Sequence, residues 1–194
     1  MTTASLPRSP ELMDRDDTAL VVVDMQAKLL PLIPGSARLI WNVRRLIDGA
    51  KILGVHAVAT EQYPQGLGPT EPQLAERLGA IPAKLAFSCG ECGELFSGLQ
   101  ERGIWKMLVC GIETHVCVGQ TVHDLLAEGF RVYVAADAVG ARGAIDHDIA
   151  LRRMDSSGAT LTTAEAALFE WCGRAGSPEF KEISRLVRES PPAE

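Results

Sequence analysis

Three residues of reactive type stand at or near the ends of predicted strands in this chain. Asp24 closes the run 19-ALVVVD-24, Lys84 lies in the stretch AKLAF, and Cys117 follows the run WKMLVC, within 110-CGIETHVCVGQT-121. A cysteine attacks as its thiolate, and a nearby cation or a helix N-terminus lowers the thiol pKa. A carboxylate can take the thiol proton and return it to a leaving group. Together the three residue types indicate nucleophilic catalysis by Cys117, with Lys84 as the cation and Asp24 as the base.

The segments that carry these residues alternate between strand and helix patterns. Short β-branched runs predict buried parallel strands, with weaker strands near AKLAF and ATLTT, and the clear runs cover residues 19–24, 55–60, 105–110 and 131–137. Apolar residues at helical spacing predict helices at 36–53, 91–102, 114–129, 144–158, 163–176 and 178–190, with Ser36 as an N-cap and Gly54 as a stop. This alternation predicts an α/β fold, a three-layer, doubly wound and mostly parallel six-stranded sheet.

The strand order decides whether the reactive residues meet. In an open parallel sheet the ligand lies beyond the carboxyl ends of the strands, where the strand order reverses. With the order 3-2-1-4-5-6, the first and fourth strands are neighbours at that point, so Asp24 and Cys117 face one crevice with Lys84 nearby. Backbone N–H groups of the turn 112–117 could then hold an oxyanion.

Other α/β chemistries lack their fingerprints in this sequence. The residues after the first strand read DMQAKLLPLIPG, which contains neither a glycine-rich dinucleotide loop nor a P-loop. There is also no G-x-S-x-G elbow for a serine hydrolase. Nucleotide binding and serine catalysis are therefore disfavoured.

Composition predicts a soluble globular protein. The 194 residues suit an N-terminal arm (1–16) and one domain (17–194), and the net charge of −6 argues against nucleic acid as a partner. No apolar run is long enough to span a membrane, and the polar N-terminus is no secretory signal. An odd count of five cysteines then favours reduced thiols and a cytoplasmic location.

Taken together, the reactive residues resemble the isochorismatase-like cysteine hydrolase family. Asp24 in LVVVDMQ, Lys84 in KLAFS and Cys117 in CGIETHVCVGQT match the family's Asp–Lys–Cys triad in order and approximate spacing. The resemblance runs from about residue 17 to about residue 170, and its most specific part is G-I-x-T-x-x-C-V. It implies a parallel six-stranded fold and a small-molecule substrate, namely a small amide or a related acyl compound that is cleaved through a Cys117 thioester. It also implies self-association.

The resemblance also implies details of the motif turn and of the metal content. It implies a cis peptide bond between Ile112 and Glu113, which aims the N–H groups of Glu113 and Cys117 at one point, the oxyanion hole. Nicotinamidase-like members bind a metal through histidines after the second strand. Here that place reads EQYPQGLG without a histidine, so we expect no metal there and no cofactor.

A substrate pocket is expected where the ends of the second and third strands converge on the motif turn. The residues that we expect to contact substrate are Gln26, Gln62, Tyr63, Phe87 and His115. Substrate identity does not follow from these residues, because the loops around them form the pocket.

Three other interpretations stay open at this point. Asp24 could hydrolyse a vinyl ether without a covalent step, as some family members do. The chain could be a non-catalytic protein that keeps the fold. Cys89-Gly-Glu-Cys92 is a C-x-x-C before a predicted helix, so a dithiol redox protein is the third.

Overall fold

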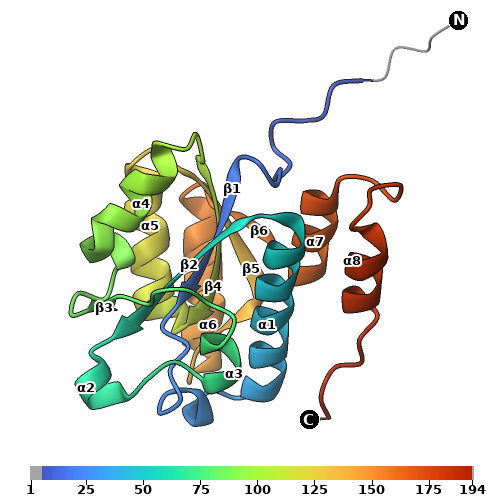
Figure 1. Cartoon of the computed structure of the whole chain (residues 1–194). Coiled ribbons are helices and arrows are strands. Elements are labelled where there is room, and N and C mark those ends of the chain that lie inside the picture. Colours follow the sequence, from blue (N-terminus) through green and yellow to red (C-terminus); the bar gives the residue numbers. More distant parts are fainter. Residues whose placement is uncertain (1–5, 194) are drawn as a thin grey trace, which may run out of the picture.

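A computed structural model describes residues 6–193, and within them the chain forms a six-stranded parallel sheet (Figure 1). The order β3-β2-β1-β4-β5-β6 confirms the doubly wound α/β arrangement predicted from the sequence. The strands are β1 (Thr18–Val23), β2 (His56–Gln62), β3 (Ala83–Lys84), β4 (Lys106–Ile112), β5 (Arg131–Gly140) and β6 (Thr160–Thr162).

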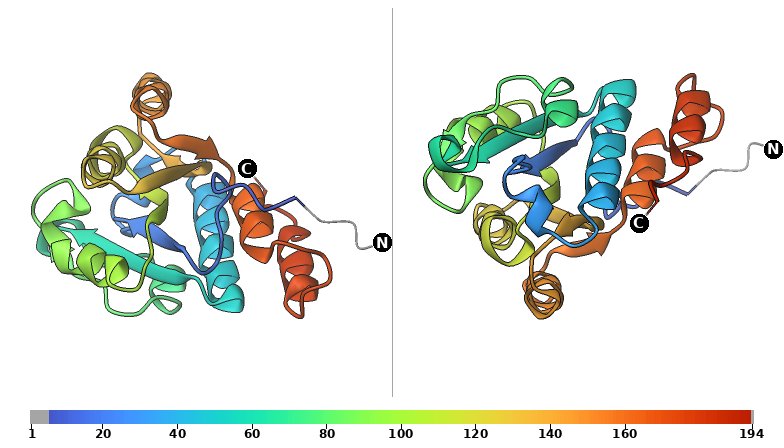
Figure 2. Two further views of the ribbon diagram at one scale, coloured as in Figure 1. Left: turned by 90° about the horizontal axis from the view of Figure 1, so that it is seen from above. Right: turned by 90° about the horizontal axis from the view of Figure 1, so that it is seen from below.

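Helices cover both faces of the sheet (Figures 1 and 2). One face carries α1 (Ser36–Leu53), α7 (Ala164–Cys172) and α8 (Phe180–Val187), and the other carries α4 (Gly93–Gln100), α5 (Gly119–Ala127) and α6 (Ala144–Ser156). The shorter turns are η1 (Leu30–Leu32), α2 (Pro64–Leu67), α3 (Pro72–Ala75), η2 (Cys89–Cys92) and η3 (Thr114–Val118). In the described part of the chain, no helix is both long enough and apolar enough to cross a bilayer.

The central strand β1 contributes to two apolar cores, one under each helical layer. Leu20 and Val22 belong to the cluster beneath α1, whereas Ala19, Val21 and Val23 belong to the cluster beneath α4 and α5. Successive side chains of a strand point to opposite faces of the sheet. A strand that is buried on both faces therefore reads as a continuous apolar run, which is why 19-ALVVV-23 shows no polar alternation.

The switch point of the sheet lies between β1 and β4. β1 pairs with β2 on one side and with β4 on the other, so that Val23 lies opposite both Thr60 and Gly111. The carboxyl ends of these strands therefore meet at one edge of the sheet. This is where a doubly wound sheet binds its ligand.

Helix α1 follows the prediction in its extent but not in its cap. It runs from Ser36 to Leu53 and ends at Gly54, whose φ angle of 75° lies in the left-handed region. The residue that precedes it is Gly35, also left-handed, and no side chain caps the helix. The expectation of Ser36 as the N-cap was therefore wrong, because Ser36 is already the first helical residue.

The predicted helix 114–129 is two elements. Residues 114–118 form η3, a π-helical turn, and the α-helical residues begin only at Gly119. A Cβ atom at Gly119 would lie 3.0 Å from the Thr114 carbonyl oxygen, so the two elements join tightly. Cys117 consequently lies in a wide turn before α5, rather than in the first turn of an α-helix.

The chain before β1 packs against the sheet end that is opposite the switch point. Met13 is fully buried and donates its N–H to the Glu170 carboxylate (2.8 Å), and Lys106 Nζ donates to the Leu12 carbonyl (2.7 Å). The expected arm of residues 1–16 is thus partly tied down, although its residues 1–5 lie outside the described residues. Its boundary with the domain stays a prediction.

Candidate active site

Asp24 directly follows β1 at the switch point, and it is fully buried. Its φ angle is 50°, in the left-handed region that residues other than glycine seldom occupy. Two hydrogen bonds hold this backbone: the Asp24 N–H donates to the Thr60 carbonyl (3.2 Å), and the Asp24 carbonyl accepts from the Gln26 N–H (2.7 Å). Such strain persists only where the surrounding structure imposes it, which is characteristic of functional sites.

Lys84 is the second residue of β3, and its ammonium group is directed into the site. Its Nζ donates to Asp24 Oδ2 (2.6 Å), to Gln62 Oε1 (2.7 Å) and to the Phe87 carbonyl (2.8 Å), and it lies 3.3 Å from the Ala86 carbonyl. The Asp24 and Lys84 side chains are both fully buried. A buried ammonium is tolerated when all of its protons have acceptors, as they do here.

Cys117 approaches this ion pair from η3. It is buried, and its Sγ lies 4.0 Å from Gln62 Oε1, the same oxygen that accepts from Lys84. Its thiol also interacts with the Asp24 carboxylate. The structure thus brings Asp24, Lys84 and Cys117, which are far apart in the sequence, into one buried cluster.

The Cys117 thiol favours its protonated form in this environment. Burial is the largest cause of its raised pKa, and the neighbouring Asp24 carboxylate is the next. Lys84 lowers the same pKa by a smaller amount. Lys84 therefore acts on the thiol pKa in the predicted direction, but burial and the Asp24 carboxylate outweigh it.

Gly111 sets the distance between β1 and β4 at the site. Its φ angle is 119°, and a Cβ atom at this position would lie 2.0 Å from the Val23 carbonyl oxygen and 2.7 Å from the Val23 nitrogen. Only glycine allows this approach. The strand that leads to Cys117 therefore lies directly against the residue that precedes Asp24.

The motif turn after β4 has the form that the resemblance implies. The peptide bond between Ile112 and Glu113 is cis. The Glu113 carbonyl accepts from the N–H groups of Val116 (3.0 Å) and Val118 (3.2 Å), and the Glu113 carboxylate accepts from Arg142 (3.0 Å). Both ends of the turn are thus fixed.

The family of the chain follows from comparison with known proteins. A family model for the isochorismatase domain matches residues 18–166, which include all three clustered residues. The chain belongs to the isochorismatase family.

Individual members of the isochorismatase family cover nearly the whole chain. Isochorismatase domain-containing protein 2 of Pongo abelii is 41% identical over 176 residues, or 89% of this chain and 84% of the relative. The solved structure of a protein named MAR1 ribonuclease, from Caenorhabditis elegans, is 38% identical with a TM-score of 0.87, covering 94% of this chain and 95% of that one. The YcaC gene product of Escherichia coli, described as an octameric hydrolase of unknown specificity, is 25% identical with a TM-score of 0.80, covering 93% and 89%. Membership of this family supports a hydrolase.

Gln26 and Gln62, two of the residues that we expected to contact substrate, make hydrogen bonds that hold the isochorismatase-family site together. Gln26 is fully buried, and its amide donates to the carbonyls of Gln62 (2.9 Å) and Gly68 (2.6 Å) while accepting the Gln62 N–H (2.8 Å). Gln62 accepts from Lys84 and donates to the Leu85 carbonyl (2.8 Å). The structure therefore corrects the role of Gln26: its amide holds the loop after β2 and leaves no group for a substrate.

Tyr63 and Phe87 present exposed rings beside the cluster. Tyr63 is 50% exposed and has a left-handed φ angle of 38°, while Phe87 is 52% exposed and gives its carbonyl to Lys84. The chain segments that bear these rings are the ones that Lys84 and Gln62 fix. Their place in a substrate pocket stays a prediction.

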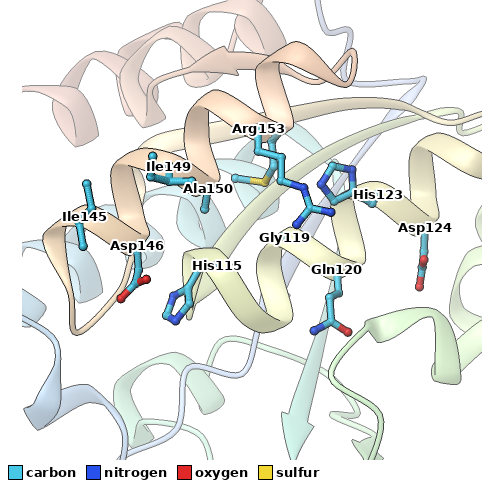
Figure 3. A pocket seen from close by; sticks show the side chains of 11 residues that line it. His115, Gly119, Gln120, His123, Asp124, Ile145, Asp146, Ile149, Ala150 and Arg153 are labelled. Carbon is cyan, nitrogen blue, oxygen red and sulfur yellow. The ribbon is translucent and has the colours of Figure 1, made fainter.

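His115 faces a different cavity from the one that was predicted for it. It lines a pocket of about 360 Å³ between α5 and α6, together with residues such as His123 and Arg153 (Figure 3). Its Nδ1 is buried and has no hydrogen-bond partner. None of Asp24, Lys84 and Cys117 lines this pocket. His115 is connected to the triad because it lies in η3, the turn that also contains Cys117.

Thr60 and Thr121 are site residues that sequence reasoning missed. The Thr60 hydroxyl donates to Asp24 Oδ1 (2.9 Å), and the Thr121 hydroxyl accepts the N–H of Cys89 (2.9 Å). Both threonines are buried. Thr60 ends the run 55-VHAVAT-60 as Asp24 ends 19-ALVVVD-24, and this shared position at a strand end was the available signal.

The structure does not favour a dithiol site at Cys89 and Cys92. Cys89 is fully buried, and burial together with the Asp24 charge raises the pKa of its thiol to about 11. Reactive redox thiols are instead partly exposed and have lowered pKa values. Both thiols are free.

No metal-binding cluster is evident in the part of the chain that the structure describes. Within residues 6–193, no three His, Cys, Asp or Glu side chains are arranged to hold a metal ion. The end of β2 and the loop after it, where nicotinamidase-like relatives would carry histidines, instead hold Gln62 and Tyr63.

Proposed function

We propose that this protein is a cysteine hydrolase that cleaves a small amide or a related acyl compound through a thioester on Cys117. The observation that supports this proposal most strongly is the convergence of Asp24, Lys84 and Cys117 at the carboxyl ends of neighbouring strands. A buried carboxylate beside a buried thiol supplies a base and a nucleophile in one place.

The first half of the reaction forms the thioester. Because the raised pKa of Cys117 keeps its proton on sulfur, the proton passes to Asp24 as the sulfur attacks the substrate carbonyl carbon. Lys84 remains charged beside Asp24 throughout and holds the carboxylate in position. The tetrahedral intermediate then collapses: the C–N bond breaks, and Asp24 returns the proton to the leaving amine.

The second half of the reaction releases the acid. Asp24, again a carboxylate, takes a proton from a water molecule that attacks the thioester carbonyl carbon. The C–S bond breaks, and the sulfur regains the proton from Asp24. The cycle thus uses one carboxylate as acid and base in turn and needs no other proton carrier.

The backbone of the motif turn is the proposed oxyanion hole. The proposed donors are the N–H groups of Glu113 and Cys117. The Glu113 carbonyl in the same turn accepts from the N–H groups of Val116 and Val118, which fixes the turn. One such donor is typically worth about 3–4 kcal/mol of transition-state stabilisation. The rings of Tyr63 and Phe87 would contact the part of the substrate that remains outside.

A turnover comparison tests the nucleophile. A panel of small amides, with p-nitrophenyl acetate as a chromogenic acyl donor, is assayed with the wild type, with Cys117→Ala and with Cys92→Ala as a matched control. We expect Cys117→Ala to lower turnover by about a thousandfold or more, while Cys92→Ala retains it. Full turnover by Cys117→Ala would mean that no thioester on Cys117 is needed, and cleavage of an added vinyl ether by that variant would support ether hydrolysis by Asp24 without a covalent step.

One of the similar structures is named a ribonuclease, so the substrate panel should also include an RNA oligonucleotide. RNA binding depends on cations that face phosphates. This chain has a net charge of −6, and the ammonium of the cluster is already bonded to Asp24, Gln62 and the Phe87 carbonyl. We therefore place RNA below acyl compounds as a substrate class.

We also propose that the protein self-associates through α6, with a second copy of the chain as the partner. Ile145 and Ile149 lie one turn apart on this helix and are 67% and 50% exposed, and Figure 2 shows α6 at the rim of the molecule. Asp146 and Asp148 precede Ile149, Arg152 and Arg153 follow it, and one further acid, Asp155, lies near the end of the helix. Within residues 6–193 none of these five side chains forms an ion pair.

This distribution of charge is complementary to itself. Two α6 helices that pack antiparallel about Ile149 bring Asp146 and Asp148 of each helix toward Arg152 and Arg153 of the other. A twofold contact of this kind uses the same patch on both copies. The octameric state described for the YcaC gene product of Escherichia coli is consistent with self-association.

A further inference from the structure

Cys89 lies in the hydrogen-bond network of the base, although the chemistry above assigns it no step. Its Sγ is 3.2 Å from Thr60 Oγ1, and Thr60 in turn donates to Asp24 Oδ1. Cys89 and Thr60 are both buried. The two oxygens of the Asp24 carboxylate thus have different partners: Oδ2 binds Lys84, and Oδ1 binds Thr60.

The direction of each hydrogen bond follows from the number of protons. A threonine hydroxyl has one proton and can accept further bonds on its oxygen. The proton of Thr60 goes to Asp24, because a carboxylate can only accept. The contact between Thr60 and Cys89 must therefore use the S–H proton of Cys89, which donates to Thr60 Oγ1.

Cys89 is also attached to the helix that follows the nucleophile. Its backbone N–H donates to Thr121 Oγ1 (2.9 Å), and Thr121 lies one turn of chain beyond Cys117. The start of η2 is further fixed by Ser88, whose hydroxyl accepts the Gly90 N–H (3.0 Å). Cys89 therefore joins two parts of the site, the β2 end that orients Asp24 and the α5 segment that follows Cys117.

We propose that Cys89 is a positioning residue, whose thiol holds the Thr60 hydroxyl on Asp24 Oδ1 and so fixes the orientation of the catalytic base. This inference rests on the proposed function, in which Asp24 takes the proton of Cys117. It assigns a purpose to Cys89 that does not involve oxidation, and it leaves Cys92 outside the site.

The burial of the thiol is consistent with this donor role. A thiol can donate only while it is protonated, and burial together with the Asp24 charge keeps the pKa of Cys89 at about 11. Cys89 therefore remains a donor at neutral pH. Oxidation of Cys89 would remove the donor.

Loss of the thiol has two expected consequences. Without its second partner, the Thr60 hydroxyl can turn away from Asp24, so the carboxylate loses part of the bonding that favours its charged form. The carboxylate then binds a proton more tightly, and the acidic limb of the rate profile moves to higher pH. Substrate binding should change little, because Cys89 is fully buried beneath the site.

The test uses the full-length protein and the acylation of the enzyme by p-nitrophenyl acetate. The single-turnover rate constant and the apparent dissociation constant are measured across pH for the wild type, Cys89→Ala, Cys89→Ser and Cys92→Ala. We expect Cys89→Ala to lower the rate constant about fivefold to tenfold, the scale of one hydrogen bond, with an upward shift of the acidic limb. Cys89→Ser restores a donor and should recover most of the rate and the original limb, and Cys92→Ala should match the wild type.

A second variant keeps the proposal testable if Cys89→Ala does not fold. Thr60→Val is close in shape to threonine and removes the hydroxyl itself, so it should shift the acidic limb in the same direction. Unchanged profiles in both Cys89→Ala and Thr60→Val would overturn the proposal. An equal loss of rate in Cys89→Ala and Cys89→Ser without a shift of the limb would also overturn it, because a cavity alone would then explain the loss.

Failure of the proposed function has a separate signature. If Cys117→Ala is acylated as fast as the wild type, then the thioester mechanism is wrong. If Cys117→Ala is not acylated but Cys89→Ala keeps the wild-type pH profile, then only the role of Cys89 is wrong.

Discussion

At the scale of single residues, the site depends on an ion pair whose two side chains are fully buried. Asp24 and Lys84 are fully buried, and each makes further hydrogen bonds, with Thr60 on one side and with Gln62 and the Phe87 carbonyl on the other. Such pairs add little net stability, but removing one partner leaves a buried charge without compensation. The pair is therefore better explained by catalysis than by stability.

Substitution of the lysine measures this dependence. We expect Lys84→Met to lower the free energy of unfolding by about 3–5 kcal/mol, because Asp24 would stay buried without its cation. Lys51→Met, at an exposed position of α1, is the control and should change it by less than about 0.5 kcal/mol. Urea unfolding of both variants gives the comparison. Equal stability of Lys84→Met and Lys51→Met would contradict the buried pair.

A buried thiol outside the site makes stability depend on alkaline pH. Burial raises the pKa of Cys110 above its ordinary value of 9.0, and Cys110 is fully buried in β4. The folded state therefore keeps its proton when the unfolded chain has lost it. This contribution to stability is fully present below about pH 9 and is lost as the pH rises.

The loss is measurable against a variant that lacks the thiol. By about pH 10 the wild type should lose roughly 1.4 kcal/mol more than Cys110→Ala does, relative to the stability of each at neutral pH. Urea midpoints at the two pH values provide the measurement. Parallel losses in the two proteins would show that Cys110 does not titrate in this way.

At the scale of elements, the sequence predicted the strands and their ends better than it predicted the turns. β1 and β4 are buried on both faces, so their composition alone marks them, and Asp24 and Lys84 follow from the rule that ligands lie beyond the carboxyl ends. The π-helical turn around Cys117 has the same apolar spacing as the start of an α-helix. Its true form depends on contacts that the local sequence does not show.

The supporting residues of the site were beyond sequence reasoning for a related reason. Thr60, Thr121 and the amide of Gln26 act through hydrogen bonds between segments that are far apart in the chain. A polar residue at a strand end can as well be a loop residue in water. Only the packed structure distinguishes the two. It also shows that His115 lines another pocket and that the Gln26 amide bonds to the Gln62 carbonyl.

The contact between β1 and β4 offers a test at the same scale. We expect Gly111→Ala to lower the free energy of unfolding by about 3 kcal/mol or more, because its Cβ would overlap the Val23 carbonyl and φ there is 119°. Gly129→Ala is the matched control, with a φ angle of 84° and nothing within 4 Å, and should cost about 1–2 kcal/mol. Thermal or urea unfolding gives both values. A cost for Gly111→Ala no greater than that for Gly129→Ala would mean that the strands can separate freely.

At the scale of the whole molecule, the two helical layers leave α6 with an apolar face that the described chain does not cover. Its buried residues are Ala150 and Met154, while Ile145 and Ile149 face outward. A surface helix usually buries its one apolar stripe against the core and carries polar residues on its outer face, so two exposed isoleucines there are unusual. The face is therefore the surface through which we expect two copies to associate.

Sedimentation velocity tests that association. The wild type should sediment as an oligomer, and Ile149→Lys should shift it toward the monomer by placing a charge at the centre of the contact. Leu32→Lys, at another exposed apolar position, is the control and should leave the assembly unchanged. An unchanged oligomer in Ile149→Lys would exclude α6 as the interface, and a monomeric wild type would exclude self-association.

The central claim is that substrates are acylated onto Cys117, and the most direct measurement is the intact mass of the enzyme during turnover. The protein is mixed with p-nitrophenyl acetate, quenched in acid within the first turnover and analysed by mass spectrometry, and the modified peptide is then mapped. The account predicts one added acetyl group, located on Cys117 and absent from Cys117→Ala. An unmodified enzyme during active turnover, or an acetyl group on another residue that Cys117→Ala retains, would contradict it.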